Sequence, residues 1–141
     1  MDDTKRYLIR KPKQLNALVS AVRQEIADIL GEMDTASVAE IASALGRPAD
    51  ALYFHLRALT RAGLVRQAGY RKRGRHKEAL YRTAGELKLA YDPRNADNRR
   101  GIQAIVSSMM RLGIRDFGRA SQRTDVNVTG ARRELWALRK T

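Results

Sequence analysis

The sequence predicts a mainly α-helical fold of the α+β class with one small β-hairpin. Three patterns predict this class: apolar residues at three- and four-residue spacing over residues 12–31, two further short helical stretches separated by a glycine, and apolar and aromatic segments on both sides of a basic loop at residues 71–77. The first spacing is that of one helix face, and the last pattern is typical of a hairpin.

A long first helix is expected over residues 12–31. Pro12 suits the first turn, where its missing N–H is not needed, and Gly31 suits the left-handed position that ends a helix. The apolar residues that would form one face are Leu15, Leu18, Val19, Val22, Ile26, Ile29 and Leu30.

A short second helix is expected over residues 38–45. Ser37 and Glu40 have the spacing of a capping box, in which the serine oxygen accepts an amide of the first turn and the glutamate reaches back to the serine amide. Val38, Ile41, Ala42 and Leu45 would form its apolar face, and Gly46 would end it with a sharp turn.

A third helix is expected over residues 48–62, opened by Pro48 and ended by Gly63. Leu52, Leu56 and Leu59 would face the core. Two helices then flank a tight turn, an arrangement in which the first helix braces the second so that it can enter a DNA major groove about 12 Å wide.

The pattern becomes extended after residue 63. Residues 64–70 and 78–84 predict the two strands of a hairpin, with Gly74 at or near its tip. Residues 86–92 alternate at Leu87, Leu89 and Tyr91, which predicts either a further short strand or an extended connector.

Residues 98–119 predict a last helix whose apolar side is unusually broad. A side of that width favours pairing with a second copy of the chain, through Ile102, Ile105, Val106, Met109, Leu112 and Phe117. Residues 124–141 alternate at Val126 and Val128, and no element is assigned there. The expected domains are therefore residues 1–84 and a segment of connector, dimerisation helix and tail over residues 85–141.

The charge of the chain points to a polyanionic partner. The formal net charge is +13, from 28 Lys and Arg against 15 Asp and Glu, and residues 37–84 hold 10 of the basic and 3 of the acidic residues. Neutralised phosphates release counterions, so nucleic acid is the favoured partner class over a merely soluble basic protein.

Composition also argues against several other classes. The chain has no cysteine and two histidines, which excludes disulfides and thiolate metal sites and leaves no self-sufficient zinc site. Asp2 and Asp3 replace the basic start of a signal peptide, and no apolar run reaches the length of a membrane span, so we expect a cytoplasmic protein without secretion or membrane insertion. No catalytic motif and no cofactor are predicted.

The outer side of the third helix supplies the predicted base and phosphate contacts. Arg57 can bond guanine with two hydrogen bonds, whereas the Tyr53 hydroxyl more often finds a phosphate. For Phe54, packing in the core and contact with DNA are equally favoured roles. For His55, a structural hydrogen bond is favoured over ligand binding. The predicted DNA-binding residues of this region are Arg47, Ala49, Asp50, Tyr53, Phe54 and Arg57.

The hairpin loop supplies a second predicted contact, to the DNA backbone or the minor groove. Its function would be electrostatic; the alternative is an ordinary solvated charge run. The loop residues concerned are Arg71, Lys72, Arg73, Arg75 and Lys77.

The run SVAEIASALGRPADALYFHLRALTRAGLVRQAGYRKRGRHKEALYRTA resembles the winged helix-turn-helix core of the ArsR-like transcriptional regulators, above all in SVAEIASALG, FHLRAL and RAGLV. The resemblance covers residues 12–84 and sets residues 98–119 in the place of the family's dimerisation helix. Pro48 stands where the family often has a capping serine. The cysteine pair of the family's metal sensors is absent, and GARRELWALRKT resembles the start of a strand in longer relatives, so the chain would be a truncated or naturally short version.

Together these patterns predict a sequence-specific DNA-binding regulator, a repressor by resemblance, that acts as a homodimer on a palindromic operator of double-stranded DNA. The main alternative is a winged-helix protein that binds RNA or DNA without sequence choice; a protein-interaction module and an enzyme are less favoured. A small-molecule effector would fit a cavity near Met109 and Met110, although core packing is the favoured interpretation of these methionines.

Overall fold

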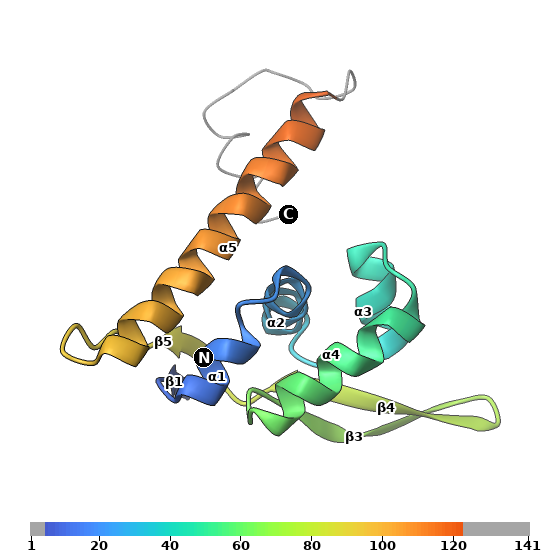
Figure 1. Cartoon of the computed structure of the whole chain (residues 1–141). Helices are drawn as coiled ribbons and strands as arrows, with labels where there is room; N and C mark the ends of the chain where they lie inside the picture. The colour runs from blue at the N-terminus through green and yellow to red at the C-terminus, as the bar shows by residue number, and fades with distance from the viewer. Residues whose placement is uncertain (1–4, 123–141) are drawn as a thin grey trace.

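The computed structural model describes residues 5–122 (Figure 1). It confirms the predicted α+β class: the chain forms five helices and a small antiparallel sheet whose hairpin projects from the domain, and the last helix extends away from it. The elements are β1 (Arg6–Ile9), α1 (Pro12–Ala17), α2 (Ala21–Met33), β2 (Ala36–Ser37), α3 (Val38–Leu45), α4 (Ala49–Arg61), β3 (Val65–Arg73), β4 (His76–Thr83), β5 (Glu86–Leu89) and α5 (Ala96–Ser121).

The single helix predicted over residues 12–31 is wrong, because the chain turns at residues 18–20 and forms α1 and α2 instead. Ser20 is the N-cap of α2, and its hydroxyl oxygen accepts the N–H of Arg23 at 3.5 Å. Gln24 closes the end of α1 by donating from Nε2 to the Leu18 carbonyl at 2.7 Å. The apolar spacing continues across this turn, so the periodicity alone hid it.

The end predicted for this helix at Gly31 is also wrong. The α2 helix continues to Met33, and Asp34 takes the positive φ of 68° while its N–H bonds to the Leu30 carbonyl at 2.9 Å. The ψ of Asp34 is −60°, and the Thr35 N–H bonds to the Met33 carbonyl at 2.8 Å, so the helix ends in a γ-turn and not in the left-handed helical conformation that favours glycine.

The start of α3 is confirmed as a capping box. The Ser37 hydroxyl accepts the Glu40 N–H at 3.2 Å, and the Glu40 carboxylate accepts the Ser37 N–H at 3.1 Å. Gly46 ends the helix with a φ of 64°, a left-handed conformation that favours glycine. The turn between α3 and α4 is therefore set by local sequence.

The hairpin is confirmed, and its strands are longer than predicted. Strand β4 pairs antiparallel with both β2 and β3, and only Gly74 and Arg75 form the turn. A second, parallel pair joins β1 to β5. The sequence analysis missed β1, because its partner lies about 80 residues further along the chain. The boundary predicted at residue 84 therefore separates two paired strands.

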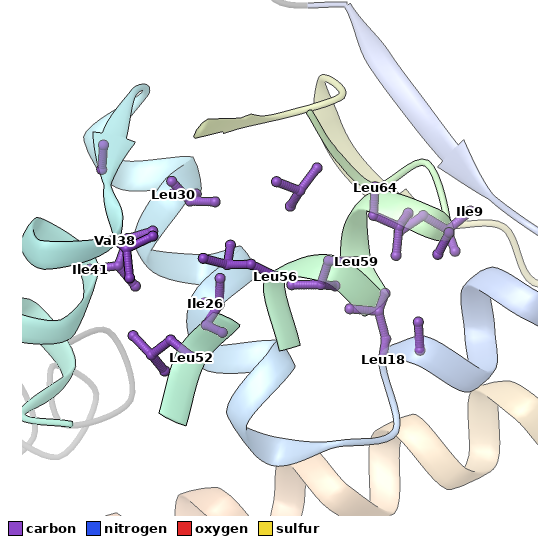
Figure 2. Packing of buried hydrophobic residues seen from close by; sticks show 14 of the residues in the cluster. Ile9, Leu18, Ile26, Leu30, Val38, Ile41, Leu52, Leu56, Leu59 and Leu64 are labelled. Atoms are coloured by element: carbon purple, nitrogen blue, oxygen red, sulfur yellow. The ribbon is translucent and has the colours of Figure 1, made fainter. Parts of the chain in front are cut away.

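The core holds α4 with one face inward, as predicted. Figure 2 shows Leu52, Leu56 and Leu59 packed among buried side chains of α2 and α3, and all three are at most 2% exposed. Replacing one such leucine with alanine costs about 2–5 kcal/mol. The opposite face of α4 is thereby held outward.

The base of α5 is fixed to the domain at two places. Asn98 is buried; its Nδ2 donates to the Ala90 carbonyl at 2.9 Å and its Oδ1 accepts the Asp92 N–H at 2.7 Å. Gly101 lies so close to α1 that a Cβ would meet the Leu15 side chain at 3.0 Å. Beyond these residues α5 runs past α2, where Arg115 pairs with Glu25 at 2.7 Å, and its C-terminal end extends away from the domain, as Figure 1 shows.

Candidate nucleic-acid interface

The outward face of α4 carries most of the predicted contact residues. Asp50, Tyr53, Phe54 and Arg57 are exposed at the spacing of one helix side, and Phe54 is 59% exposed. Ala49 differs, because it packs partly against the core. Arg57 has no ion pair within residues 5–122, so its guanidinium is available to a base or phosphate.

The helix begins without a side-chain cap. Pro48 is the N-cap residue instead of the first helical one, and it has no side chain that could accept an amide. Asp50 lies in the first turn, where a negative charge interacts favourably with the helix dipole. This accounts for a carboxylate on a face that is otherwise suited to phosphate.

Arg47, predicted to contact DNA, is held by an ion pair within the chain. Its Nε lies 3.2 Å from a carboxylate oxygen of Glu25 on α2, and the other oxygen of Glu25 lies 2.7 Å from a guanidinium nitrogen of Arg115 on α5. The Glu25 side chain is only 16% exposed, which strengthens both pairs. Arg47 therefore links the turn to α2 and α5 instead of standing free.

Phe54 and His55 form a cluster with Arg23 of α2, which the sequence analysis did not find. The Nε of Arg23 donates to the Nδ1 of His55 at 3.2 Å, and the guanidinium carbon lies 5.7 Å from the centre of the Phe54 ring. The structural hydrogen bond expected for His55 is present. Burial, and then the charges of Arg23 and Arg47, lower the pKa of His55.

The stability of the domain should therefore fall in mild acid. In the unfolded chain His55 is protonated near its ordinary pKa of 6.5, whereas in the folded chain it is protonated only at a lower pH. The free energy of unfolding therefore falls as the pH drops below about 6.5. Thermal unfolding at pH 7.5 and 5.5 measures this. In His55→Gln, whose amide oxygen still accepts from Arg23 but does not titrate, the difference should shrink; an unchanged difference would contradict the assignment.

This pH range separates His55 from the acidic groups. The Ser37 N–H and the Arg71 guanidinium lower the pKa of Glu40, so the stability that Glu40 contributes is lost only as the pH falls below about 4.5. For Glu78, burial raises the pKa, but hydrogen bonds from Arg71, Ser37 and Arg73 outweigh it and lower the pKa overall.

The basic residues of the hairpin lie in strands, so they alternate between two faces. Arg71 and Arg73 share one face with Glu78, which pairs with them at 3.1 Å and 3.2 Å, and Arg71 also pairs with Glu40. Lys72 and Lys77 face each other across the strands on the opposite side. The hairpin thus has one partly neutralised face and one with unpaired lysines.

The tip and the second face hold the charges most available to a polyanion. Lys72, Arg75 and Lys77 are exposed, and none of them has an ion pair in the part of the chain that the structure describes. Arg73 remains largely exposed despite its pair, whereas Arg71 is tied to two carboxylates. We therefore assign Arg71 mainly to holding the hairpin against α3.

A hollow of about 250 Å³ connects α4 with the hairpin. Arg57 lines it from α4 and Gln67 from β3, so the two elements border one surface. Arg61 also lines it, and sequence reasoning missed both Arg61 and Gln67. The sequence did contain a signal for Arg61, because it follows Arg57 by four residues and therefore lies on the same side of the helix.

Comparison with known families agrees with this geometry. Residues 18–68 match the family model of the helix-turn-helix domain. The match runs from the end of α1 through α4 into β3, so it contains both helices, the Gly46 turn and the start of the hairpin. This domain is a DNA-binding module of regulators and not an enzymatic one. No curated protein shows significant similarity to the chain.

Outside the helix-turn-helix domain, α5 divides the residues predicted for dimerisation into two groups. Ile105 and Leu112 are buried and Ile102 packs partly against the core, so these side chains serve the chain itself. Val106, Met109 and Phe117 are exposed. Two exposed apolar residues of α5 were missed or misread: Ile114 is 70% exposed, and Met110, for which core packing was favoured, is 64% exposed.

The exposed apolar residues of α5 form one stripe. Val106, Met110 and Ile114 follow one another at four-residue intervals, and Phe117 continues the line three residues later, opposite the buried side that holds Ile105. We name these four residues the α5 stripe. None of the helices within residues 5–122 is long and apolar enough to cross a membrane.

Proposed function

We propose that the chain is an ArsR-like transcriptional regulator that binds a specific double-stranded DNA sequence as a homodimer and represses transcription. The observation that carries the proposal is the outward face of α4, which borders the basic hairpin across one hollow. A helix of 13 residues is about 20 Å long and fits the major groove, while the hairpin can reach the adjacent backbone or minor groove.

The residues of this face have different roles in the proposal. Arg57 reads a base, because an unpaired guanidinium can bond guanine bidentately. The Tyr53 hydroxyl binds a phosphate, and Lys72, Arg75 and Lys77 add contacts that do not depend on sequence. Arg47 and Arg71 position the helix and the hairpin, since both are already ion-paired.

The homodimer part of the proposal depends on the α5 stripe. A contiguous exposed apolar surface of this kind is more often an interaction site than a surface that stays in contact with water. In a two-fold symmetric dimer, the α5 stripe of each copy packs against the α5 stripe of the other. The two α4 helices would then bind half-sites about one turn of DNA apart on a palindrome. Repression and a cytoplasmic location follow from the ArsR-like resemblance and the DNA target, as does regulation by a small-molecule effector.

Selection of bound duplexes from a random pool tests the proposed function. We expect a palindrome, because a two-fold dimer presents the same surface to both half-sites. Arg57→Ala should relax the preference at one position of each half-site and cost about tenfold in affinity for the selected sequence. Enrichment of no sequence would instead support a general nucleic-acid binder, and an unchanged selected sequence for Arg57→Ala would assign that arginine to phosphate.

A further inference from the structure

A cavity of about 280 Å³ lies along the face of α2 that carries Gln24, Ala27 and Gly31. It is bordered by α2, the β1–β5 pair and α5, is partly open to solvent, and is also lined by Thr83 at the end of β4. Its walls are mainly apolar and come from Ile9, Leu18, Leu87, Leu89, Ile105 and Met109. None of these groups takes part in the proposed DNA contacts.

One buried polar atom at this cavity has no partner. Gln24 lines the cavity and is only 6% exposed, and its Nε2 donates to the Leu18 carbonyl at 2.7 Å. That bond fixes the orientation of the amide, and the Oε1 is left buried without a hydrogen bond in the described part of the chain. A buried acceptor without a donor is unfavourable, so a ligand that donates a hydrogen bond to it would be stabilised there.

Thr83 also presents an acceptor at the cavity. The Thr83 hydroxyl donates to the Gly85 carbonyl at 2.9 Å, which leaves only acceptor lone pairs on Thr83. Among residues 5–122, no lysine, arginine or histidine lines the cavity, so this lining does not suit an anion.

We propose that this cavity binds a small apolar molecule that carries an O–H or N–H donor and no negative charge, with the donor on the Gln24 Oε1. The volume is nearly twice the roughly 150 Å³ that holds a benzene ring, so a fused two-ring molecule of the naphthol type fits. A single ordered water is the competing occupant, because it too would satisfy the carbonyl.

Occupancy of the cavity would reach the DNA-binding face through α2; this consequence rests on the proposed function. Glu25 follows Gln24 on α2 and holds Arg115 of α5 and Arg47 of the turn. A ligand that favours one arrangement of α2 and α5 therefore shifts the ion pairs that position α4.

Calorimetric titration of the full chain with three probes tests the site. We expect 2-naphthol to bind at least tenfold more tightly than 2-methoxynaphthalene, whose oxygen has no proton to donate, and 2-naphthoate to bind weakest. Equal binding of the three probes, or binding of none, would overturn the proposal and leave water as the occupant. Because this titration contains no DNA, it remains informative if the chain fails to bind duplexes.

Variants at Gly31 locate the binding to this cavity. Gly31 lies on α2 at the cavity, and a Cβ there meets no atom within 4 Å, so larger side chains are accommodated without a clash. We expect Gly31→Leu to fold and to weaken 2-naphthol binding at least tenfold, while the matched control Gly31→Ala keeps it. Gln24→Leu should abolish the preference for 2-naphthol over its methyl ether. Full binding by Gly31→Leu would contradict the site.

Discussion

Replacing Ile114 with glutamate is expected to convert the proposed dimer into a monomer and to lower its affinity for a palindromic duplex at least 100-fold. Ile114 lies near the middle of the α5 stripe and is 70% exposed, so the substitution breaks no contact of the core. In the dimer it would bury a carboxylate against a copy of itself, which is strongly unfavourable. Two linked half-site contacts exceed one by about 10²–10⁴ in affinity, and this gain would be lost.

Light scattering and duplex titration on the same samples measure both effects. Asn16→Glu is the matched control, because it adds the same charge at an exposed position of α1 and should leave both the mass and the affinity unchanged. Titration with a single half-site separates the two roles, since Ile114→Glu should bind it as well as the parent chain does. A parent chain that is already monomeric at micromolar concentration would contradict the dimer.

Removing the unpaired charges of the hairpin is expected to weaken binding to all duplexes alike. In a triple variant with Lys72, Arg75 and Lys77 replaced by alanine, the slope of log affinity against log salt should fall by up to about 2.7, from about 0.9 for each phosphate contact. At 0.1 M salt the affinity should drop roughly 10- to 500-fold. The selected sequence should stay the same, because these contacts do not read bases.

A variant with the same loss of charge far from the hairpin controls for the general electrostatic field. In Figure 1, α1 and the start of α5 lie at the end of the domain opposite the hairpin tip. Lys11 and Lys13, at the start of α1, and Arg94, just before α5, are exposed. Their joint replacement by alanine should change the slope of log affinity against log salt by less than about 0.9, the value for one phosphate contact. Equal losses in the two triple variants would show that net charge, and not the hairpin, determines binding.

Local sequence was sufficient where the structure depends on local interactions. The Ser37 and Glu40 capping box, the left-handed Gly46 and the three inward leucines of α4 could all be predicted, because each depends on residues within one or two turns. The hairpin followed in the same way from Gly74 and its flanking strands. These features are the ones that hold the α4 face outward.

Partners distant in sequence could not be predicted. The pairing of β1 with β5 joins residues about 80 positions apart, and the Glu25 pairs with Arg47 and Arg115 span 22 and 90 positions. Sequence reasoning therefore could not show that Arg47 and Arg71, which it predicted as DNA contacts, pair with carboxylates in the fold. The break between α1 and α2 was missed for a different reason, since both helices direct apolar residues to one core and keep the spacing unbroken.

Nuclear magnetic resonance of the amide groups during titration with duplex DNA tests the central claim most directly, namely that α4 and the hairpin face the same polyanion. In dilute buffer we expect saturable shifts at Tyr53, Phe54 and Arg57 together with shifts at Arg75, and none at Lys13 in α1. No binding even at low salt, or amide shifts in α1 without any shifts in α4, would contradict the account.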